Sequence, residues 1–226
     1  MERVSIPVED GVLPAVVVHG ARVPGPVVVM VPAAFGVADD VLSQLDEMAE
    51  HASMVVALDL FWRDGRGIIP YVDMPNVMAR IRDLDRERAV ADVLAVCRWA
   101  RVQDGSSGQV LGLGVCLGGP FVFLAAQRGF LDAVVTWHGS RLDTFLADAD
   151  TMRCPMALHF GECDRVVPLD TVDRVKAAFA GRDDVEVTVH LGADHGFSHP
   201  LGPTYDEAAA RAGMESVRGL LAGLGA

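Results

Sequence analysis

The chain has 226 residues, of which 51% are hydrophobic and 22% charged, and its formal net charge is −12 at pH 7. This apolar content is typical of a folded protein with a large core and argues against an intrinsically disordered chain. The negative charge argues against nucleic acid or an anionic membrane as a partner, because phosphate groups would be repelled.

Export and membrane insertion are not expected. The first ten residues, MERVSIPVED, carry charges where an export signal would have its apolar region. The uncharged run over residues 23–38 contains three prolines and two glycines and is too short to span a bilayer. Four cysteines stand at irregular spacings, at positions 97, 116, 154 and 163, and we expect reduced thiols there. The sequence therefore predicts a cytoplasmic protein.

The predicted elements alternate along the chain. Residues 5–20 predict an antiparallel hairpin that turns at residues 9–11. The expected strands then cover residues 26–32, 54–61, 109–115, 132–138, 155–161 and 184–191, and the expected helices residues 39–52, 84–102, 118–128, 169–180 and 204–223. Most of these strands are apolar on both faces, which is typical of a parallel sheet covered by helices on each side. We therefore expect one α/β domain over residues 1–226.

A glycine-rich segment, GLGVCLGG (residues 112–119), spans the end of the third of these strands. A dinucleotide-binding G-x-G-x-x-G fingerprint would need glycine at Leu117 and a place in the first βαβ unit, and a P-loop would need Lys-Ser/Thr. The segment fits neither pattern. It does fit G-x-C-x-G around Cys116, a nucleophile elbow with Cys in place of Ser, and the following helix would favour a thiolate there. On these five residues alone, a buried core cysteine is an equal alternative.

The order of later residues favours a catalytic cysteine. Asp164 follows the predicted strand 155–161, and His195 follows strand 184–191, which is the order nucleophile, acid, histidine that this architecture requires. Parallel sheets bind ligands along the edge where strands end, and these residues all gather there. Asp164 as a turn residue, Asp194 as a competing acid and His195 as a plain loop residue are the structural alternatives.

No metal or cofactor is expected. The nearest candidate for zinc combines Cys154, His159 and Cys163, but the first two would point to opposite faces of one strand.

With these residues in view, the chain resembles the dienelactone hydrolase family of α/β-hydrolases. The matching stretches are PAAFGV (32–37), ALDLFWR (57–63), GVCLGG (114–119), GECDRVVP (161–168) and DHGF (194–197). The resemblance implies that Cys116 is the nucleophile, His195 the base and Asp164 its orienting acid, with the amides of Leu117 and Ala34 as the oxyanion hole. The implied reaction is attack on an ester or lactone carbonyl through an acyl-thioester intermediate.

The chain departs from the family prototype at two positions. Where the prototype has a glutamate that helps to activate the thiol, this chain has Ala33, so we expect a resting Cys116 thiolate. Of two prototype arginines that hold the substrate carboxylate, Arg63 matches one and His199 replaces the other. A structural Arg63, paired with Asp64 or another acid, is an equal alternative. The expected substrate-binding residues are Phe35, Trp62, Arg63 and His199.

Only residues 138–154 lie between the strands where related folds insert a lid, so the sequence predicts no lid domain and a small substrate. We therefore expect a hydrolase of a small ester or lactone, with an anionic substrate as one option. The alternative is a non-catalytic or redox-sensing binding protein on the same fold. The oligomeric state and the physiological substrate are not predicted.

Overall fold

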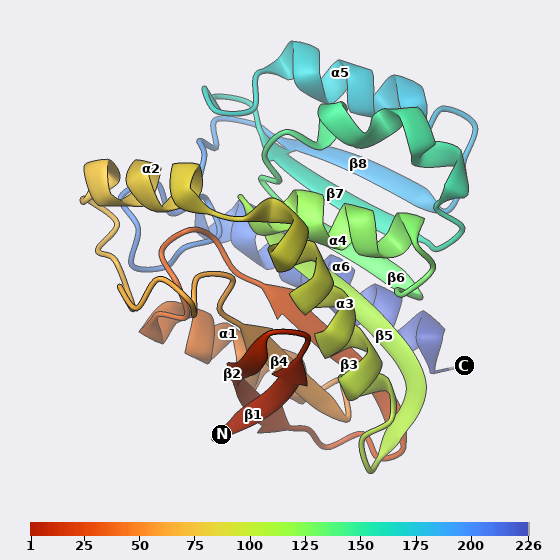
Figure 1. Ribbon diagram of the computed structural model, residues 1–226. Helices are drawn as coiled ribbons and strands as arrows, with labels where there is room; N and C mark the ends of the chain where they lie inside the picture. Colours follow the sequence, from red (N-terminus) through yellow and green to blue (C-terminus); the bar gives the residue numbers. More distant parts are fainter. Residues whose placement is uncertain (226) are drawn as a thin grey trace.

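A single eight-stranded sheet runs through the computed structural model, which describes residues 1–225 (Figure 1). Its strands are β1 (Glu2–Val8), β2 (Gly11–His19), β3 (Gly25–Val31), β4 (Met54–Leu58), β5 (Ser106–Val115), β6 (Ala133–Trp137), β7 (Met156–Gly161) and β8 (Val185–His190). The helices are α1 (Asp39–Ala49), α2 (Met74–Asp83), α3 (Arg86–Arg101), α4 (Gly118–Gln127), α5 (Leu169–Ala178) and α6 (Glu207–Leu224), with a 3₁₀ segment η1 (Leu142–Thr151).

The sheet is mostly parallel, in the order β1-β2-β4-β3-β5-β6-β7-β8. β1 pairs antiparallel with β2, and β2 antiparallel with β4, whereas every later pairing is parallel. β3 and β5 are neighbours, but the chain leaves them for helices on opposite faces of the sheet, α1 and α4. Open α/β sheets bind ligands at the strand ends beside such a divergence.

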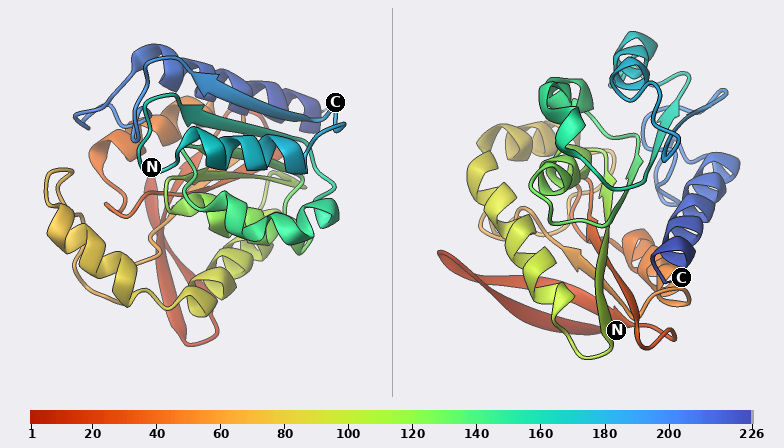
Figure 2. Two further views of the ribbon diagram at one scale, coloured as in Figure 1. Left: turned by 90° about the horizontal axis from the view of Figure 1, so that it is seen from above. Right: turned by 90° about the vertical axis from the view of Figure 1, so that its right-hand side faces the viewer.

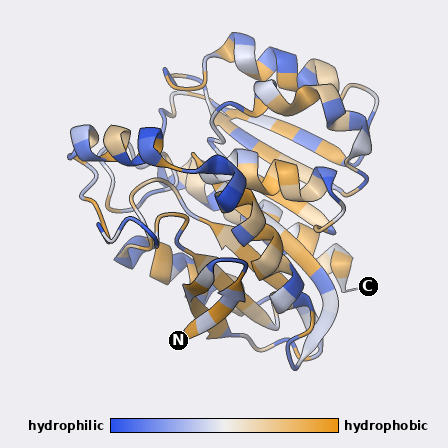
Figure 3. Ribbon diagram, viewed as in Figure 1, coloured by the Kyte–Doolittle hydropathy of each residue, from blue (hydrophilic) through white to orange (hydrophobic). Residues whose placement is uncertain are grey.

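Two helical layers bury the sheet. α1 and α6 pack on one face, and α3, α4, α5 and η1 on the other (Figure 2). Every residue of β3 and β4 is buried, because both of their faces are covered. Figure 3 shows the central strands mainly hydrophobic and the surrounding helices alternating between hydrophobic and hydrophilic positions. This pattern is the one expected for a buried parallel sheet with amphipathic helices.

The predicted fold class is confirmed: an α/β-hydrolase fold with a mostly parallel sheet, helices on both faces and an N-terminal antiparallel hairpin. The hairpin is longer than expected, because β1 begins at Glu2. Between β6 and β7 the chain forms η1 and no separate lid. Among the helices of residues 1–225, none is both long and apolar enough to cross a membrane.

Helix α2 was not expected from the sequence. It starts with a proline in its first turn, and the side chain of Asp73 caps it by accepting from the Asn76 amide. Its buried residues are only Val77 and Arg80. The Arg80 guanidinium is held inside by an ion pair with Asp64 at 2.9 Å and by hydrogen bonds to backbone carbonyls, so a cation occupies a place where an apolar residue would be expected.

Candidate active site

Cys116 lies at the tight turn between β5 and α4, with a left-handed φ of 51°. Glycines make this turn sterically feasible. A Cβ on Gly118 would lie 1.9 Å from the Val31 carbonyl oxygen, and one on Gly114 would lie 2.7 Å from the Gly118 carbonyl oxygen. The Cys116 amide donates to the Trp137 carbonyl at 3.0 Å, which ties the turn to the end of β6. The turn therefore presents the thiol at the carboxyl edge of the sheet, as a nucleophile elbow does.

The side chain of His195 lies between a thiol and a carboxylate. Its Nε2 is 3.1 Å from Cys116 Sγ, and its Nδ1 is 2.8 Å from Asp164 Oδ2. The other oxygen of Asp164 accepts the amides of Val166 and Val167 at 2.8 and 2.9 Å, so this buried carboxylate is fixed in direction. Asp194, the competing acid, accepts the backbone amide of His195 instead of contacting its ring.

The protonation of His195 results from opposing effects. Burial lowers the pKa of the imidazole, but the sulfur of Cys116 and the hydrogen bond to Asp164 outweigh this effect and raise the pKa to about 10. His195 therefore carries both ring protons at neutral pH, and Nε2–H faces the sulfur. The doubly protonated imidazole lies where it would stabilise a thiolate at Cys116.

Two backbone amides, in the segments that follow β3 and β5, have no acceptor among the described residues. Leu117 and Ala34 donate no hydrogen bond to another group in residues 1–225. The close approach of Gly118 to Val31 packs the start of α4 against the end of β3, which is followed by the Ala34 loop. The two amides therefore come from adjacent strand ends, as the donors of an oxyanion hole do.

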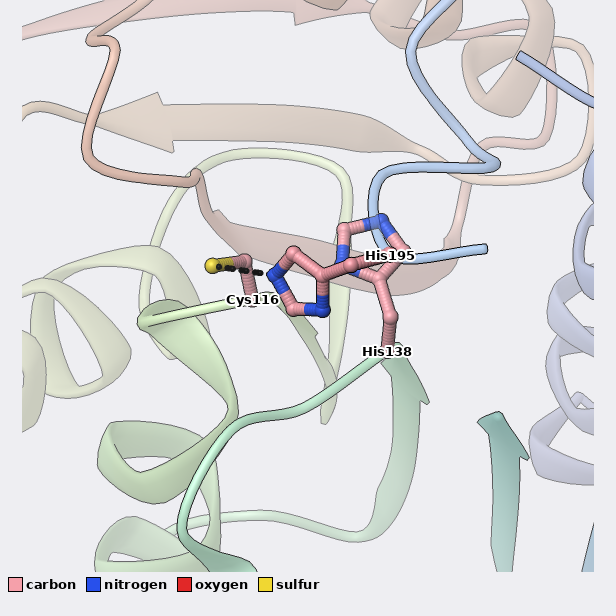
Figure 4. Close-up of side chains that lie close together, drawn as sticks. All are labelled: Cys116, His138 and His195. Carbon is pink, nitrogen blue, oxygen red and sulfur yellow. Dashed lines mark hydrogen bonds between the residues drawn. The ribbon is translucent and has the colours of Figure 1, made fainter. Parts of the chain in front are cut away.

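His138 is a site residue that the sequence analysis missed. It follows β6 with a φ of 40°, is fully buried, and its ring centroid lies 4.7 Å from that of His195. Figure 4 shows it beside Cys116 and His195. Burial holds the pKa of His138 well below its usual value, and the nearby His195 and His199 lower it further, so the ring is neutral. Its position at a strand end is the signal that would have found it.

Phe35 and His199, two of the expected substrate-binding residues, meet in an aromatic group beside the site. Their ring centroids are 5.9 Å apart, and Tyr71 packs against both at 4.5 and 5.0 Å. The Tyr71 hydroxyl donates to the buried Asp40 at 2.6 Å and lies 3.2 Å from His199 Nδ1. Burial lowers the pKa of His199 to about 4 despite Asp40, so this imidazole is also neutral. No sequence pattern connects Asp40 and Tyr71 with this group.

Arg63 and Trp62, the other two expected substrate-binding residues, form a separate cluster. The Arg63 guanidinium contacts Asp92 at 2.5 and 3.0 Å and Asp10 at 2.5 and 3.2 Å, and it stacks on the Trp62 ring at 4.2 Å. Trp62 Nε1 donates to Asp92 at 3.0 Å. These contacts agree with the alternative of a structural Arg63 paired with acidic residues, although its partners are Asp10 and Asp92 and not Asp64.

The sheet order and the elbow at its carboxyl edge are those of the α/β-hydrolases. Within that class, the chain belongs to the dienelactone hydrolase family, whose model matches residues 13–223. It is 29% identical over 214 residues to a carboxymethylenebutenolidase from Pseudomonas putida, covering 92% of this chain and 91% of that protein. It is 28% identical over 195 residues to a carboxymethylenebutenolidase from a Pseudomonas species, covering 84% and 82%.

Solved structures agree on the fold. A candidate dienelactone hydrolase from Klebsiella pneumoniae superposes with a TM-score of 0.86 at 26% identity, covering 98% of this chain and 97% of that one. A dienelactone hydrolase-like promiscuous phosphotriesterase from metagenomic libraries gives 0.84 at 23% identity, covering 100% and 98%, which supports the fold alone. The protein is therefore a dienelactone hydrolase-like enzyme that hydrolyses a small ester or lactone.

Proposed function

We propose that the enzyme uses Cys116 as its nucleophile, His195 as its general acid and base, and Asp164 to orient His195. The observation that carries this proposal is the continuous contact from Sγ through the imidazole to the carboxylate, at 3.1 and 2.8 Å. These distances lie within the reach that proton transfer requires. The position of each residue after a different strand end supports the same roles.

In acylation, the Cys116 thiolate attacks the carbonyl carbon and forms a C–S bond. The carbonyl oxygen becomes an oxyanion, which the free amides of Leu117 and Ala34 stabilise. As this intermediate collapses, the C–O bond to the leaving alkoxide breaks, and Nε2–H of His195 protonates that oxygen. In a lactone the new hydroxyl stays attached to the acyl group.

In deacylation, neutral His195 takes a proton from water, and the hydroxide attacks the thioester carbonyl. Collapse of the second intermediate releases the carboxylic acid and restores the thiolate and the imidazolium. Asp164 keeps Nδ1–H of the ring in place throughout and stabilises its charge, because its own carboxylate is fixed by two backbone amides.

The substrate is a small ester or lactone, and we propose that Phe35 and His199 contact it. Their ring group adjoins His138, whose centroid lies 5.4 Å from that of His199. A carboxylated lactone is the candidate that the name of the Pseudomonas relatives suggests, because carboxymethylenebutenolide carries a carboxylate. Binding of this anion by Arg63 requires the substrate to displace Asp10, the more exposed of its two partners.

Hydrolysis of p-nitrophenyl acetate by the wild type, Cys116→Ala and His195→Ala tests the proposed nucleophile and base. Both substitutions should lower kcat/KM by at least about 1,000-fold, because residues of a catalytic triad act as a unit. Cys163→Ser, which changes an exposed cysteine outside this contact chain, is the matched control and should keep wild-type activity. Full activity in folded Cys116→Ala would refute the proposed nucleophile.

A further inference from the structure

Three groups that prefer soft or borderline metal ions converge at the elbow. The sulfur of Cys116 and one ring nitrogen each of His138 and His195 all lie within 4.8 Å of one another. The catalytic proposal uses two of these groups and gives no task to His138. Cys116 and His138 directly follow β5 and β6, and His195 lies in the loop after β8.

His138 offers a free nitrogen. Its Nδ1 is buried without a hydrogen-bond partner in the described part of the chain, and Nε2 lies 2.8 Å from the Ser198 hydroxyl. In Figure 4 the His138 ring stands against His195, close to the contact between Cys116 and His195. If Nε2 carries the proton and donates it to Ser198, the lone pair of Nδ1 remains available. A buried, unpartnered nitrogen of this kind calls for an explanation.

In both imidazoles the ring nitrogen that faces away from the sulfur has a polar partner, as in histidines that bind metal ions. Metal-binding histidines usually donate the second ring N–H to a carboxylate, a carbonyl or another polar group, which orients the ring. His195 has Asp164 on its Nδ1 at 2.8 Å, and His138 has Ser198 on its Nε2. Each ring thus has one nitrogen held from behind and the other turned toward the sulfur.

We propose that Cys116, His138 and His195 form a binding site for a borderline divalent cation of the zinc class. One thiolate and two imidazoles suit Zn²⁺ and do not suit Mg²⁺ or Ca²⁺, which prefer oxygen ligands. Tetrahedral zinc with usual bond lengths would place its nitrogen and sulfur ligands about 3.3 to 3.7 Å apart. The present spacings, from 3.1 Å up to 4.8 Å, require only small side-chain rotations.

Occupancy of this site would block hydrolysis, a consequence that rests on the proposed function. Zinc would take the sulfur lone pair that attacks the carbonyl and the Nε2 that handles the proton. With Cys116 as the thiolate that the proposed function requires, metal binding releases one proton, from His195 to solvent, and neither Cys116 nor His138 releases one. The metal ion would therefore act as a reversible inhibitor that a chelator removes.

Metal binding is measured without reference to activity by titrating the reduced wild-type enzyme with Co²⁺ alone. We expect near-ultraviolet sulfur-to-cobalt charge-transfer absorption that Zn²⁺ displaces. Cys116→Ser should abolish this absorption, and Cys163→Ser should leave it unchanged, because Cys163 is exposed and outside the cluster. Absence of the band in the wild type, or its loss in Cys163→Ser, would overturn the proposal.

Two substitutions test the role of His138. His138→Asn keeps a residue that tolerates the left-handed backbone, and His138→Gln keeps more of the side-chain volume, so at least one should fold. Both should weaken Co²⁺ and Zn²⁺ binding at least about tenfold. Wild-type affinity in either folded variant would show that the metal ion binds elsewhere and would refute the site.

Ester hydrolysis with and without Zn²⁺ separates this proposal from the proposed function. Inhibition that EDTA reverses, and that weakens in parallel with binding in the His138 variants, supports both. If Cys116→Ser hydrolyses ester normally while the cobalt band still depends on Cys116 and His138, the metal site stands and the catalytic proposal fails. If Cys116 proves essential and the His138 variants bind zinc as the wild type does, the metal site fails alone.

Discussion

The charge state of the reacting pair depends on the side chains around His195. Burial alone would hold this histidine neutral, but the sulfur at 3.1 Å and the carboxylate at 2.8 Å raise its pKa to about 10. A glutamate at the position of Ala33 would oppose the thiolate, and the alanine there does not. We therefore predict that Cys116, the proposed nucleophile, is ionised before any substrate arrives.

Iodoacetamide labelling tests this resting state, because alkylation requires the thiolate. At pH 6, Cys116 should label rapidly, whereas Cys97 and Cys154 should not, since burial raises the pKa of their thiols to about 12 and 11. Mass spectrometry locates the labelled sites. His195→Ala should slow labelling of Cys116 at pH 6. If wild-type Cys116 labels only as the pH passes about 8.5, like a free thiol, the resting ion pair does not exist.

Arg63→Ala tests whether Arg63 binds the substrate carboxylate. If it does, the substitution should raise KM for an ester bearing a carboxylate more than for a neutral ester of the same size, because only the anion loses an ion pair. Steady-state kinetics on the two esters measure the difference. Equal effects would mean that the contacts with Asp10 and Asp92 are the whole role of Arg63.

The sequence could predict those site residues that lie in a local motif or that follow the predicted strands in a characteristic order. Glycines around Cys116 predict the turn, and the order of Asp164 and His195 after later strands predicts their place at the same edge. The group of Asp40, Tyr71 and His199 has no such signal, since its members come from separate loops and helices and meet only in the folded chain. His138 had the strand-end signal, but it was the last residue of the predicted strand 132–138 and was not considered as a site residue.

At the scale of elements, alternation of apolar runs predicted the strands from β3 to β8 to within a few residues. β3, β4, β6 and β7 are buried throughout, and parallel strands buried on both faces have a continuous apolar pattern. The same reasoning could not find α2. A helix that buries Val77 and the guanidinium of Arg80 shows little hydrophobic periodicity. Asp64, which forms the ion pair with Arg80, lies in a loop, and only the folded structure shows this contact.

The start of α4 gives a prediction about stability. Gly118→Ala should lower the free energy of unfolding by about 3 kcal/mol, because its Cβ would lie 1.9 Å from a backbone oxygen of β3 that has little freedom to move. Gly219→Ala is the matched control: it lies in α6 with no atom within 4 Å, and it should be neutral or stabilising by up to about 1 kcal/mol. Urea unfolding measures both, and equal effects would contradict the close-packing argument.

At the scale of the whole molecule, the pH dependence of stability combines opposite contributions from buried histidines. His195 has a pKa above that of an unfolded histidine, so its contribution is present below pH 6.5 and is lost as the pH rises through about 10. Burial lowers the pKa of His159 and His199 to about 4, with His190 adding to the effect at His159. Below pH 6.5 these two histidines are protonated in the unfolded chain but stay neutral in the folded chain. They therefore reduce the free energy of unfolding as the pH falls from 6.5 to 4.

His159→Phe isolates one of these contributions. The ring of His159 stacks on His190, with its Nδ1 3.0 Å from His190 Nε2, away from the Cys116 contact. Phenylalanine cannot be protonated, so the variant should lose less free energy of unfolding between pH 7 and 4.5 than the wild type, by up to about 3 kcal/mol. Urea unfolding at several pH values measures this slope, with His19→Gln as an exposed control that should follow the wild type. A slope unchanged in His159→Phe would mean that carboxylates alone cause the loss of stability in acid.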